Sequence, residues 1–318
     1  MADIVLTTLN AKYPHCALGL RYLLANLQEL EPRAALWEGD IHQQPLEVVE
    51  QILSRIPRIV GLGVYIWNVL ETRAVVSLLK RVRPEVDVVL GGPEVSHETD
   101  GQELAGMADY VIAGEADLEF ADLCRALLTG QRPAGKLIVA APPDPGALRL
   151  PYRLYRDEDL AQRMVYVESS RGCPFHCEFC LSSLDVPVRA FPLEPLLKEF
   201  EGLLERGLRR FKFVDRTFNL EIGRSVAILD FFLNHWTPGL FLHFEMIPDH
   251  FPRVLRERVR RFPAGSLQFE VGLQTLDSDV GERIRRRQDN AAAEENFRFL
   301  REETGVHVVY GLVGLKAH

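Results

Sequence analysis

The chain has 318 residues, of which 47% are hydrophobic and 26% charged, and its formal net charge is −8. This length and composition indicate about two globular domains, each with enough apolar material for a core. The acidic balance argues against a large nucleic-acid-binding surface, because the one prominent basic tract is Arg283–Arg287, and no apolar run approaches the roughly 18 residues that a membrane span needs.

The N-terminus, Met1 to Ile4, lacks the basic flank and apolar core of a secretory signal. The chain has five cysteines, and this odd number fits a reducing compartment better than a disulfide framework. We therefore expect a cytoplasmic protein with no membrane partner.

The first 130 residues alternate between strand-like and helix-like patterns. Short runs typical of buried parallel strands occur at Ile4–Leu9, Ala34–Trp37, Ile59–Tyr65, Val86–Leu90 and Tyr110–Ala113. Helical spacing occurs at Leu18–Leu30, Leu46–Ile56, 70–82 and 118–128, and Gly130 stands where a helix C-cap would. Five strands with helices between them predict an α/β domain with a doubly wound, Rossmann-like (flavodoxin-like) parallel sheet.

Residues 131–160 change character. The run Ala141-Pro-Pro-Asp-Pro-Gly146 can be neither a helix interior nor a central strand. We therefore place the first domain at 1–140, a linker at 141–160 and the second domain at 161–318.

From Met164 the alternation resumes. Strand patterns occur at Val165–Glu168, Arg210–Val214, Phe241–Met246, Leu267–Leu273 and His307–Val313. Helical patterns occur on the face formed by Leu196, Leu197, Phe200, Leu203 and Leu204 up to Gly207, then at Ser225–Asn234, at Phe251–Arg261 and in a stretch before Gly305. Five βα-type strands in about 150 residues predict a partial (βα) barrel of the TIM type.

The sharpest signal is a run of three cysteines, Cys173-Pro-Phe-His-Cys177-Glu-Phe-Cys180, just after a predicted strand. Functional groups of a barrel collect on the loops that follow its strands. Thiolates select iron–sulfur clusters, zinc or copper, and three thiolates on a four-iron cluster leave one iron open to a further ligand. The alternatives are a zinc site completed by His176 or another histidine, and three unrelated thiols.

The C-x₃-C-x₂-C spacing, with Phe179 before its last cysteine, resembles the motif of the radical S-adenosylmethionine (SAM) enzymes, and of their cobalamin-dependent group in particular. The resemblance implies a [4Fe–4S] cluster on Cys173, Cys177 and Cys180, with SAM chelating the open iron. It further implies reductive cleavage of SAM to methionine and a 5′-deoxyadenosyl radical, with Phe179 near the adenine.

Segments at the ends of later strands are similar to the family as well. Asp215 would meet the SAM amino group or the substrate, although residues 213–219 are also typical of a helix N-cap. Glu245 would bond a ribose hydroxyl, or be an exposed loop acid. Gln274 would lie near SAM, and Arg287 matches a basic residue that follows in relatives, whereas an arginine run is otherwise a solvated face.

The final segment, Tyr310-Gly311-Leu-Val-Gly314-Leu315, also resembles the family, whose members usually continue with Pro-Gly-Glu and a sixth strand. This chain has Lys316-Ala-His318 instead. The departure predicts a barrel that is incomplete at its C-terminus, with an open edge, and it puts the activity of the chain by itself in question.

Strand-end positions in the first domain resemble the cobalamin-binding domain that precedes this barrel in relatives. They are Tyr65, Trp67, Gly91, Gly92, Gly114 and Glu115. Ligands of doubly wound sheets bind beyond the strand C-termini, and glycine permits a close approach. The Asp-x-His-x-x-Gly motif that supplies a lower cobalt ligand is missing, and His15 lacks its spacing, so we expect cobalamin to bind without a protein histidine. A degenerate domain that serves as a lid or substrate platform is the alternative.

These resemblances imply a cobalamin-dependent radical SAM methyltransferase, in which methylcobalamin supplies the methyl group. A radical rearrangement, ring closure or oxidation without methyl transfer is a second interpretation. A truncated, non-catalytic protein that binds cobalamin or a cluster is a third. The expected partners are a small-molecule or peptide substrate and an external electron donor such as flavodoxin or ferredoxin, and nucleic acid is not expected.

Overall fold

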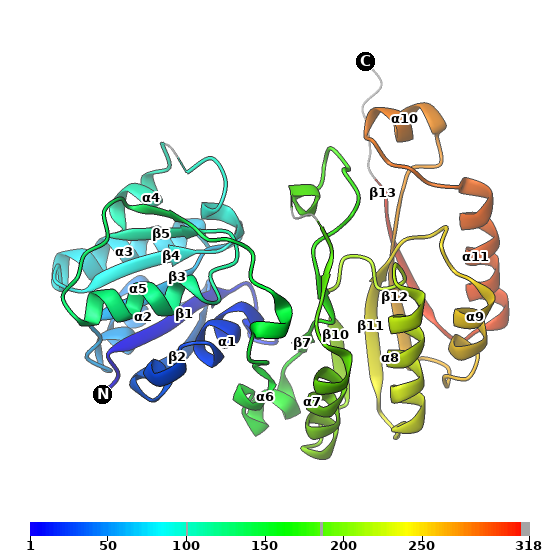
Figure 1. The fold of residues 1–318 in the computed structure, drawn as a ribbon, viewed down its shortest axis with the longest axis horizontal. Coiled ribbons are helices and arrows are strands. Elements are labelled where there is room, and N and C mark those ends of the chain that lie inside the picture. The colour runs from blue at the N-terminus through cyan, green and yellow to red at the C-terminus, as the bar shows by residue number, and fades with distance from the viewer. Residues whose placement is uncertain (100, 185–186, 313–318) are drawn as a thin grey trace. The chain divides into compact units, whose positions relative to one another are not determined.

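The computed structural model describes residues 1–99, 101–184 and 187–312. The chain divides into two compact units, Met1–Arg163 and Met164–His318. Each unit is built on its own parallel sheet with helices around it (Figure 1). No helix in the described ranges is both long and apolar enough to cross a membrane.

The first unit holds a six-stranded parallel sheet in the order β2-β1-β3-β4-β5-β6. Its strands are β1 (Ile4–Asn10), β2 (Ala34–Asp40), β3 (Ile59–Gly63), β4 (Asp87–Gly91), β5 (Tyr110–Ala113) and β6 (Leu137–Val139). The predicted doubly wound fold is confirmed, and the strand order reverses between β1 and β3, where such sheets bind ligands. The expectation of five strands was wrong. β6 escaped notice because Leu137 and Val139 are exposed, so it lacks the buried run that marks the other strands.

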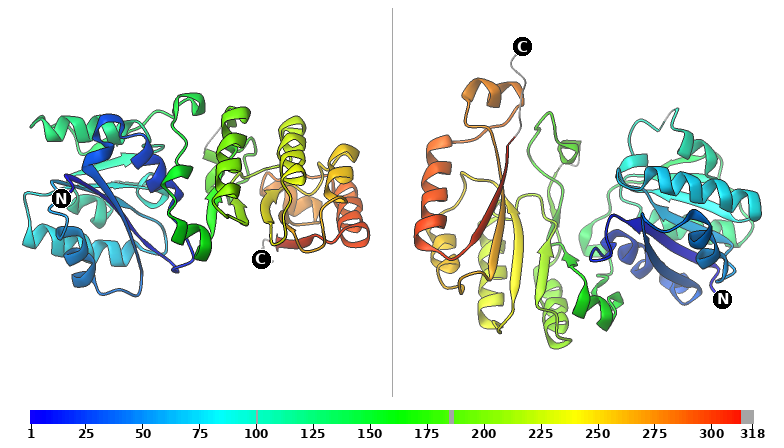
Figure 2. Two further views of the ribbon diagram at one scale, coloured as in Figure 1. Left: turned by 90° about the horizontal axis from the view of Figure 1, so that it is seen from below. Right: turned by 180° about the vertical axis from the view of Figure 1, so that it is seen from behind.

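Helices cover both faces of this sheet (Figures 1 and 2). Buried residues of α2 (Pro45–Leu53), α3 (Val69–Val82) and α4 (Glu103–Met107) share one apolar core with the strands. Those of α1 (Leu18–Ala25) and α5 (Glu119–Leu128) share a second core. Alternate residues of β1 belong to the two cores, which places the cores on opposite faces, and all seven residues of β1 are buried.

The helix predicted over Leu18–Leu30 is shorter than expected. It ends before Asn26 and is followed by a 3-10 helix, η1 (Gln28–Arg33). The Asn26 side-chain amide donates to the carbonyls of Tyr22 (2.9 Å) and Arg149 (3.1 Å). Because apolar residues continue at helical spacing through both elements, the pattern alone could not reveal this break.

Residues 141–160, which the sequence predicts as a linker, belong in the structure to the first unit. They include two 3-10 turns, η3 (Pro145–Ala147) and η4 (Tyr152–Leu154), and the start of α6 (Asp157–Gln162). Tyr152 and Tyr155 are both 1% exposed. Proline-rich composition therefore marks an irregular segment here, but one that is packed rather than free.

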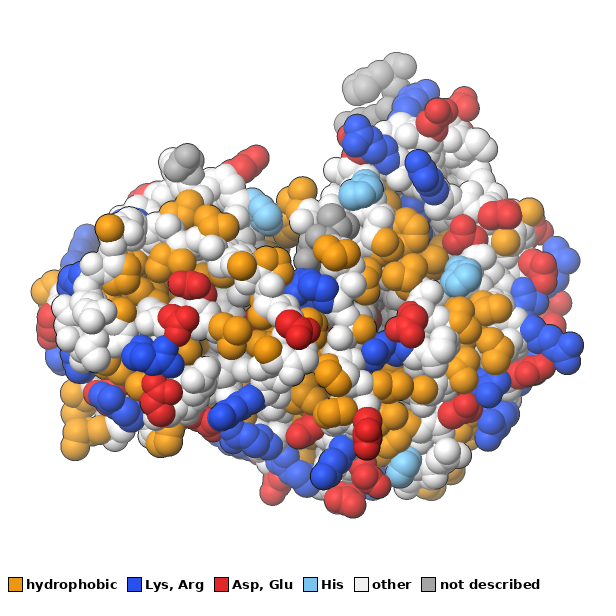
Figure 3. Space-filling view, viewed as in Figure 1, with side chains coloured by type: hydrophobic (Ala, Val, Ile, Leu, Met, Phe, Trp, Pro, Cys, Tyr) orange, Lys and Arg blue, Asp and Glu red, His pale blue; other side chains and the backbone are white. Residues whose placement is uncertain are grey.

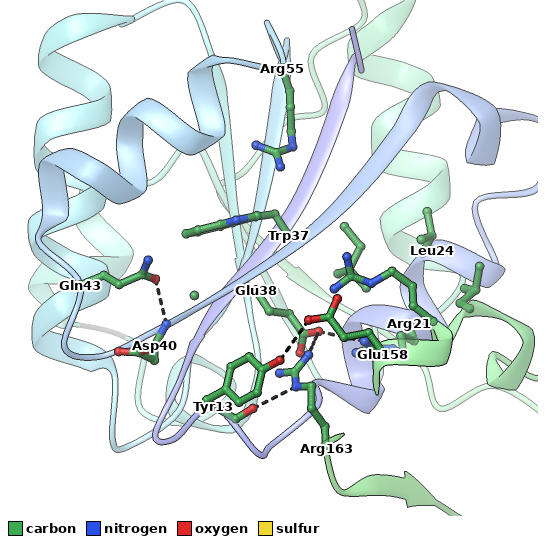
Figure 4. Close-up of a pocket in the computed structure, with 14 residues that line it drawn as sticks. Tyr13, Arg21, Leu24, Trp37, Glu38, Asp40, Gln43, Arg55, Glu158 and Arg163 are labelled. Atoms are coloured by element: carbon green, nitrogen blue, oxygen red, sulfur yellow. Dashed lines mark hydrogen bonds and ion pairs between the residues drawn. The ribbon is translucent and has the colours of Figure 1, made fainter. Parts of the chain in front are cut away.

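A buried charge cluster of Arg21, Glu38, Asp159 and Arg163 holds α6 and the residue after it against α1 and β2; Figure 4 shows three of the four side chains. Arg21 Nη2 lies 2.9 Å from Glu38 Oε2 and 3.1 Å from Asp159 Oδ2. Arg163 Nη1 lies 3.0 Å from an oxygen of each carboxylate. Burial alone would raise the pKa of Glu38, but the two arginines outweigh burial and hold that pKa below its ordinary value.

The second unit holds a five-stranded parallel sheet in the order β13-β12-β11-β10-β7. Its strands are β7 (Val165–Val167), β10 (Arg210–Phe213), β11 (Phe241–Met246), β12 (Leu267–Gln274) and β13 (His307–Leu312). The helices α7 (Leu193–Glu205), α8 (Ile222–Asn234), α9 (Arg253–Val259) and α11 (Asn290–Glu303) lie outside the curved sheet (Figures 1 and 2). The predicted partial barrel is confirmed, while the end of the final segment, residues 313–318, lies outside the described residues.

Several short elements of the second unit were not predicted. They are a hairpin of β8 (Ser170–Arg171) and β9 (Arg189–Ala190), a 3-10 helix η5 (Leu181–Leu184), and a helix α10 (Ser278–Arg283). All are too short to show a period in the sequence. They lie after β7 and β12, on the side of the sheet where a barrel carries its functional groups.

Side chains of β12 alternate between the two faces of this sheet. Leu267, Phe269, Val271 and Leu273 are buried, whereas the residues between them are less buried and mostly polar. Phe200 of α7 and Phe232 of α8 pack on Phe211 and Phe213 of β10, which forms an aromatic core on the helix side. The other side of the sheet is therefore free to carry polar groups.

Candidate functional site

The three cysteines of the C-x₃-C-x₂-C run lie in the loop between β8 and β9. Cys173 and Cys177 are buried, Cys180 is half-buried, and all three are free thiols. The loop folds back through backbone hydrogen bonds from Cys180 N to Cys177 O (3.1 Å) and from Ser183 N to Cys180 O (3.1 Å). This loop follows β7, as expected of a functional loop at a strand C-terminus.

The three thiols line one cavity of about 210 Å³, which we call the thiol cavity. Phe179, Glu245 and Gln274 line it too. Glu245 comes from β11 and Gln274 ends β12, so the cavity extends from the cysteine loop to the C-terminal ends of two central strands. Three of the five positions expected near SAM therefore lie with the cysteines.

Two carboxylates, Glu245 and Glu270, line the thiol cavity. Burial raises the pKa of Glu245 and the charge of Glu270 adds to the rise, while Arg216, with Nη1 3.7 Å from Glu245 Oε2, opposes it. Glu270 Oε2 lies 3.2 Å from His243 Nε2, and burial lowers the pKa of that histidine. Ionised carboxylates only accept hydrogen bonds, so this wall suits the hydroxyl and ammonium groups of a ligand.

Gln274 has an unusual backbone. Its φ is 61°, and the pairing of β12 with β13 shifts register between Val271 and Gln274. A β-bulge re-aims a side chain, and a left-handed residue other than glycine costs about 1–2 kcal/mol. The sequence showed the Gly-x-Gln-Thr segment but gave no sign of this strain.

Asp215 lies beneath the cysteine loop, 1% exposed. Its carboxylate accepts hydrogen bonds from Ser169 N (2.9 Å), Ser169 Oγ (2.6 Å) and Ser170 Oγ (2.7 Å). Burial raises the pKa of Asp215, although these donors oppose the rise. Asp215 is therefore bound to the chain that enters the cysteine loop, and it is absent from the lining of the thiol cavity. The alternative interpretation of this segment, a helix N-cap at Asn219, is not observed. The N-cap of α8 is Glu221, and the side-chain amide of Asn219 makes hydrogen bonds to the loop after β11 instead.

The arginine run places a different member in the thiol cavity from the one expected. Arg286 lines it, with Nη1 3.8 Å from Cys177 Sγ, and its other guanidinium nitrogen donates to the carbonyl of Gly272. Arg287 lines a neighbouring cavity instead. The sequence of the arginine run does not show which of these two side chains enters the thiol cavity. That depends on the turn after α10, in which Arg285 has a φ of 53°. Arg286 is thus a site residue that sequence reasoning missed.

The donor set fits a cluster better than a single ion. Burial raises the pKa of Cys173, and the neighbouring thiols Cys180 and Cys177 add to the rise; all three cysteines line the thiol cavity. Among the described residues, however, no group of three or more His, Cys, Asp or Glu side chains is drawn together as the ligands of one metal ion. Three thiolates suffice for a [4Fe–4S] cluster with one open iron, whereas a closed structural zinc site takes four protein ligands.

In the first unit, the aromatic residues singled out by the sequence form a pair just after β3. The rings of Tyr65 and Trp67 are stacked, with centroids 4.6 Å apart and planes 5° from parallel. Trp67 is 44% exposed and Tyr65 half-buried. A rigid, flat and partly exposed aromatic pair at the C-terminal edge of a doubly wound sheet suits a large planar ligand.

Glycines hold the neighbouring loops close together. Gly91 ends β4, and Gly92, at φ 109°, would place an added Cβ only 2.5 Å from Val64 O. Gly114, at φ 89°, donates its N–H to Ser96 Oγ (3.1 Å), and Glu115 follows it half-buried. These glycines are needed for loop approach and left-handed backbone, so they shape the edge whether or not they touch a ligand.

Asn68 organises this edge, and the sequence did not single it out. Asn68 is fully buried; its amide nitrogen donates to Leu9 O (3.0 Å) and Gly63 O (3.2 Å), and its oxygen accepts from Tyr65 N (2.8 Å). It thereby ties the ends of β1 and β3 together at the point where the strand order reverses. His15 lies in the loop after β1, where its carbonyl accepts from Asn10 Nδ2 (3.0 Å).

Comparison with protein families divides the chain in the same way. Residues 4–124 match the B12 binding domain, and residues 167–318 match the radical SAM superfamily. Among curated relatives, an uncharacterized methyltransferase of Pyrococcus horikoshii is 28% identical over 236 residues, 66% of this chain and 51% of its own. TokK of Streptomyces tokunonensis, named a cobalamin-dependent radical SAM methyltransferase, is 25% identical over 257 residues, 68% of this chain and 37% of its own. The chain thus spans about half or less of these relatives' length.

Two solved structures share the architecture of nearly the whole chain. One is the radical SAM methyltransferase TsrM from Kitasatospora setae with cobalamin and a [4Fe–4S] cluster bound, with a TM-score of 0.75 and 17% identity over 98% of this chain and 66% of that one. The other is the cobalamin-dependent SAM radical enzyme OxsB with aqua-cobalamin bound, with a TM-score of 0.77 and 15% identity over 98% of this chain and 49% of that one. At these identities the likeness establishes the fold.

Proposed function

We propose that this chain, which belongs to the family that joins a B12-binding domain to a radical SAM domain, is the catalytic part of a cobalamin-dependent radical SAM methyltransferase. The observation that carries the proposal is the thiol cavity, in which three free thiols meet Glu245 and Gln274 at the ends of central barrel strands. Curated relatives are also named methyltransferases, which supports methyl transfer over other radical chemistry.

Cys173, Cys177 and Cys180 would hold the [4Fe–4S] cluster. When bound, that cluster supplies one electron and an open iron for reductive cleavage of SAM. Burial of Cys173 and Cys177 limits the access of water to two of the three ligands, which favours reactive radical chemistry. Asp215 fixes the entry to the loop by accepting from Ser169 and Ser170.

The remaining lining residues would bind SAM. Glu245 would accept a hydrogen bond from a ribose hydroxyl, and Gln274 would offer both a donor and an acceptor from its amide. Phe179, 43% exposed, would pack against the adenine. The guanidinium of Arg286, beside Cys177, would offset the negative charge that thiolates bring to the cavity. Arg287 could reach the carboxylate of SAM only by turning away from the neighbouring cavity that it lines.

In the first unit, the loop edge formed by Tyr65, Trp67, Gly91, Gly92, Gly114 and Glu115 would hold cobalamin. Bound there, cobalamin supplies the methyl group that is transferred. The stacked Tyr65 and Trp67 offer a flat apolar surface to the corrin, and Gly92 lets the loop after β4 lie close against Val64 at this edge. The substrate would be a small molecule or peptide. A reducing compartment such as the cytoplasm suits the five free thiols.

The test uses the full-length gene product, purified without oxygen and assayed for iron, acid-labile sulfide and corrinoid. With reductant and methyl-labelled SAM, we expect 5′-deoxyadenosine and labelled product. Deoxyadenosine without any transferred label would overturn methyl transfer and leave radical SAM cleavage standing. A sample that contains no iron and forms no deoxyadenosine would overturn the whole proposal.

A further inference from the structure

A compact basic surface stands at the end of α10, on a chain whose formal net charge is −8. We call it the arginine surface and define it as Arg283, Arg285, Arg286, Arg287 and His176. The last four line one cavity of about 600 Å³ together with Pro174 and Phe175 of the cysteine loop. Figure 3 shows basic side chains gathered around α10. The carboxylates of Asp277 and Asp279 lie at the opposite end of this helix, whereas the exposed Glu282, in its last turn, lines the same cavity as the arginines.

Much of this positive charge is not neutralised within the chain. Arg285 pairs with Glu178, Nε to Oε1 at 2.8 Å. Across residues 1–99, 101–184 and 187–312, Arg283 and Arg287 make no ion pair, although both are exposed. Exposed arginines elsewhere in the unit, such as Arg298 and Arg301, each pair with a neighbouring glutamate. The arginine surface is thus free to attract an acidic partner at long range.

One side chain joins this surface to the thiol cavity. Arg286 lines both cavities, lies with its guanidinium 5.9 Å from the Phe175 ring centroid, and reaches to 3.8 Å from Cys177 Sγ. A partner docked on the arginine surface would therefore sit within one side chain's reach of the cluster ligands. The other cysteines of the sequence, Cys16 and Cys124, are buried in the first unit.

We propose that the arginine surface is the docking site of an acidic, low-potential one-electron carrier protein of the flavodoxin type. This inference rests on the proposed function, which requires an electron from outside the chain. In the transfer, the reduced carrier loses one electron and the cluster gains it, and no atom or proton moves between the two proteins. Charge complementarity sets the encounter rate and the orientation of such a complex.

The first test is binding. Labelled oxidised flavodoxin is titrated with anaerobically prepared full-length protein, and anisotropy is followed at low and at moderate salt. The double variant Arg283→Glu/Arg285→Glu should weaken binding by roughly tenfold or more and flatten its salt dependence. The matched control Arg298→Glu/Arg301→Glu makes the same charge change on α11 and should bind as the wild type does. Equal affinity in the two double variants would overturn the proposal.

The second test separates docking from chemistry. Deoxyadenosine formation is measured with a small chemical reductant and, in parallel, with photoreduced flavodoxin. The single variant Arg283→Glu, which leaves the Arg285–Glu178 pair at the cysteine loop intact, should keep the chemical rate and lose roughly threefold or more of the flavodoxin-supported rate at subsaturating carrier. If the wild type forms no deoxyadenosine with either reductant, the proposed function fails, while the binding titration still decides the docking surface. Loss of both rates in the variant would show damage to the cysteine loop, and would overturn the assignment of these arginines to docking alone.

Discussion

The two parallel sheets of this protein are built from the same βα units but are covered differently. β1 in the first unit has all seven residues buried, because helices pack on both faces. β12 in the second unit alternates, with four apolar residues against the helices and Gln268, Glu270 and Gln274 left less buried. A sheet covered on both faces can offer a site only at its strand ends, whereas one covered on a single face can also present side chains from within its strands.

The largest expected effect is that of removing the cysteines of the second unit, which tests whether its sheet carries a cluster site. Changing Cys173, Cys177 and Cys180 together to alanine should reduce iron from about four atoms per chain to none, and abolish deoxyadenosine formation. The measurement is iron and sulfide analysis of anaerobically reconstituted protein. Cys16→Ala and Cys124→Ala are the controls and should keep full iron, because both thiols are buried in the first unit and neither lines the thiol cavity. Iron retained by the triple variant would remove the basis of the proposed function.

The fold was largely predictable because the spacing of apolar residues along the sequence reflects which faces of each strand and helix are buried. Continuous apolar runs predicted β1, β3, β4 and β5, which lie between two cores. The prediction failed for elements that lack such a pattern of apolar residues. β6 is exposed, and the end of α1 depends on hydrogen bonds from Asn26 to residues including Arg149, far along the chain. Contacts across more than a hundred residues leave no local pattern to detect.

The site was predictable in its composition and less so in its geometry. The cysteine spacing and the strand-end positions of Glu245 and Gln274 brought together residues that do line one cavity. The placement of Asp215 beneath the loop, and of Arg286 rather than Arg287 beside Cys177, depends on the hairpin and on the turn after α10. Both are tertiary features, since adjacent arginines in a run have the same chemistry and differ only in direction.

The buried charge cluster of the first unit tests whether the two units can be perturbed separately. Glu38→Gln leaves Arg21 and Arg163 with one carboxylate, Asp159, and should lower the free energy of unfolding by about 3–5 kcal/mol. Glu31→Gln, which removes the half-buried partner of the exposed Arg153, should cost less than about 1 kcal/mol. Urea unfolding followed by fluorescence in a Trp236→Phe background reports the first unit, because Trp37 and Trp67 both lie there.

The same cluster fixes the direction of a pH effect. The folded-state pKa of Glu38 is lowered, so its contribution is full above the ordinary value of 4.5 and is lost as pH falls through the lower folded value. The wild type should therefore lose more stability than Glu38→Gln does between pH 7 and acid. Iron bound by the second unit should be unchanged by Glu38→Gln at pH 7. A parallel loss of iron would mean that the two units do not fold independently.

A smaller effect is expected at the wall of the thiol cavity. Glu245→Gln should weaken SAM binding roughly tenfold, the loss of one hydrogen bond to a charged acceptor. Because the pKa of Glu245 is raised, its carboxylate becomes protonated at a higher pH than that of an ordinary glutamate. The affinity of the wild type for SAM should therefore begin to fall at a higher pH on acidification. The variant, which has no carboxylate at this position, should lack this fall. Equilibrium dialysis with reconstituted protein measures both. Glu257→Gln, on the exposed face of α9, is the control, and equal losses in the two would contradict a role in binding.

The smallest effect concerns the strained backbone at Gln274, where side chain and main chain can be separated. Gln274→Ala and Gln274→Gly both remove the amide, so they should weaken SAM binding equally. They should differ in stability, because glycine adopts the observed φ of 61° without the steric penalty that alanine bears. The free energy of unfolding should therefore be about 1 kcal/mol higher for the glycine variant than for the alanine variant, even though glycine makes the unfolded chain more flexible. Urea unfolding of the two variants, side by side, measures this difference. An alanine variant at least as stable as the glycine variant would show that the bulge at the end of β12 is not under strain, and that its shape comes from the strand pairing alone.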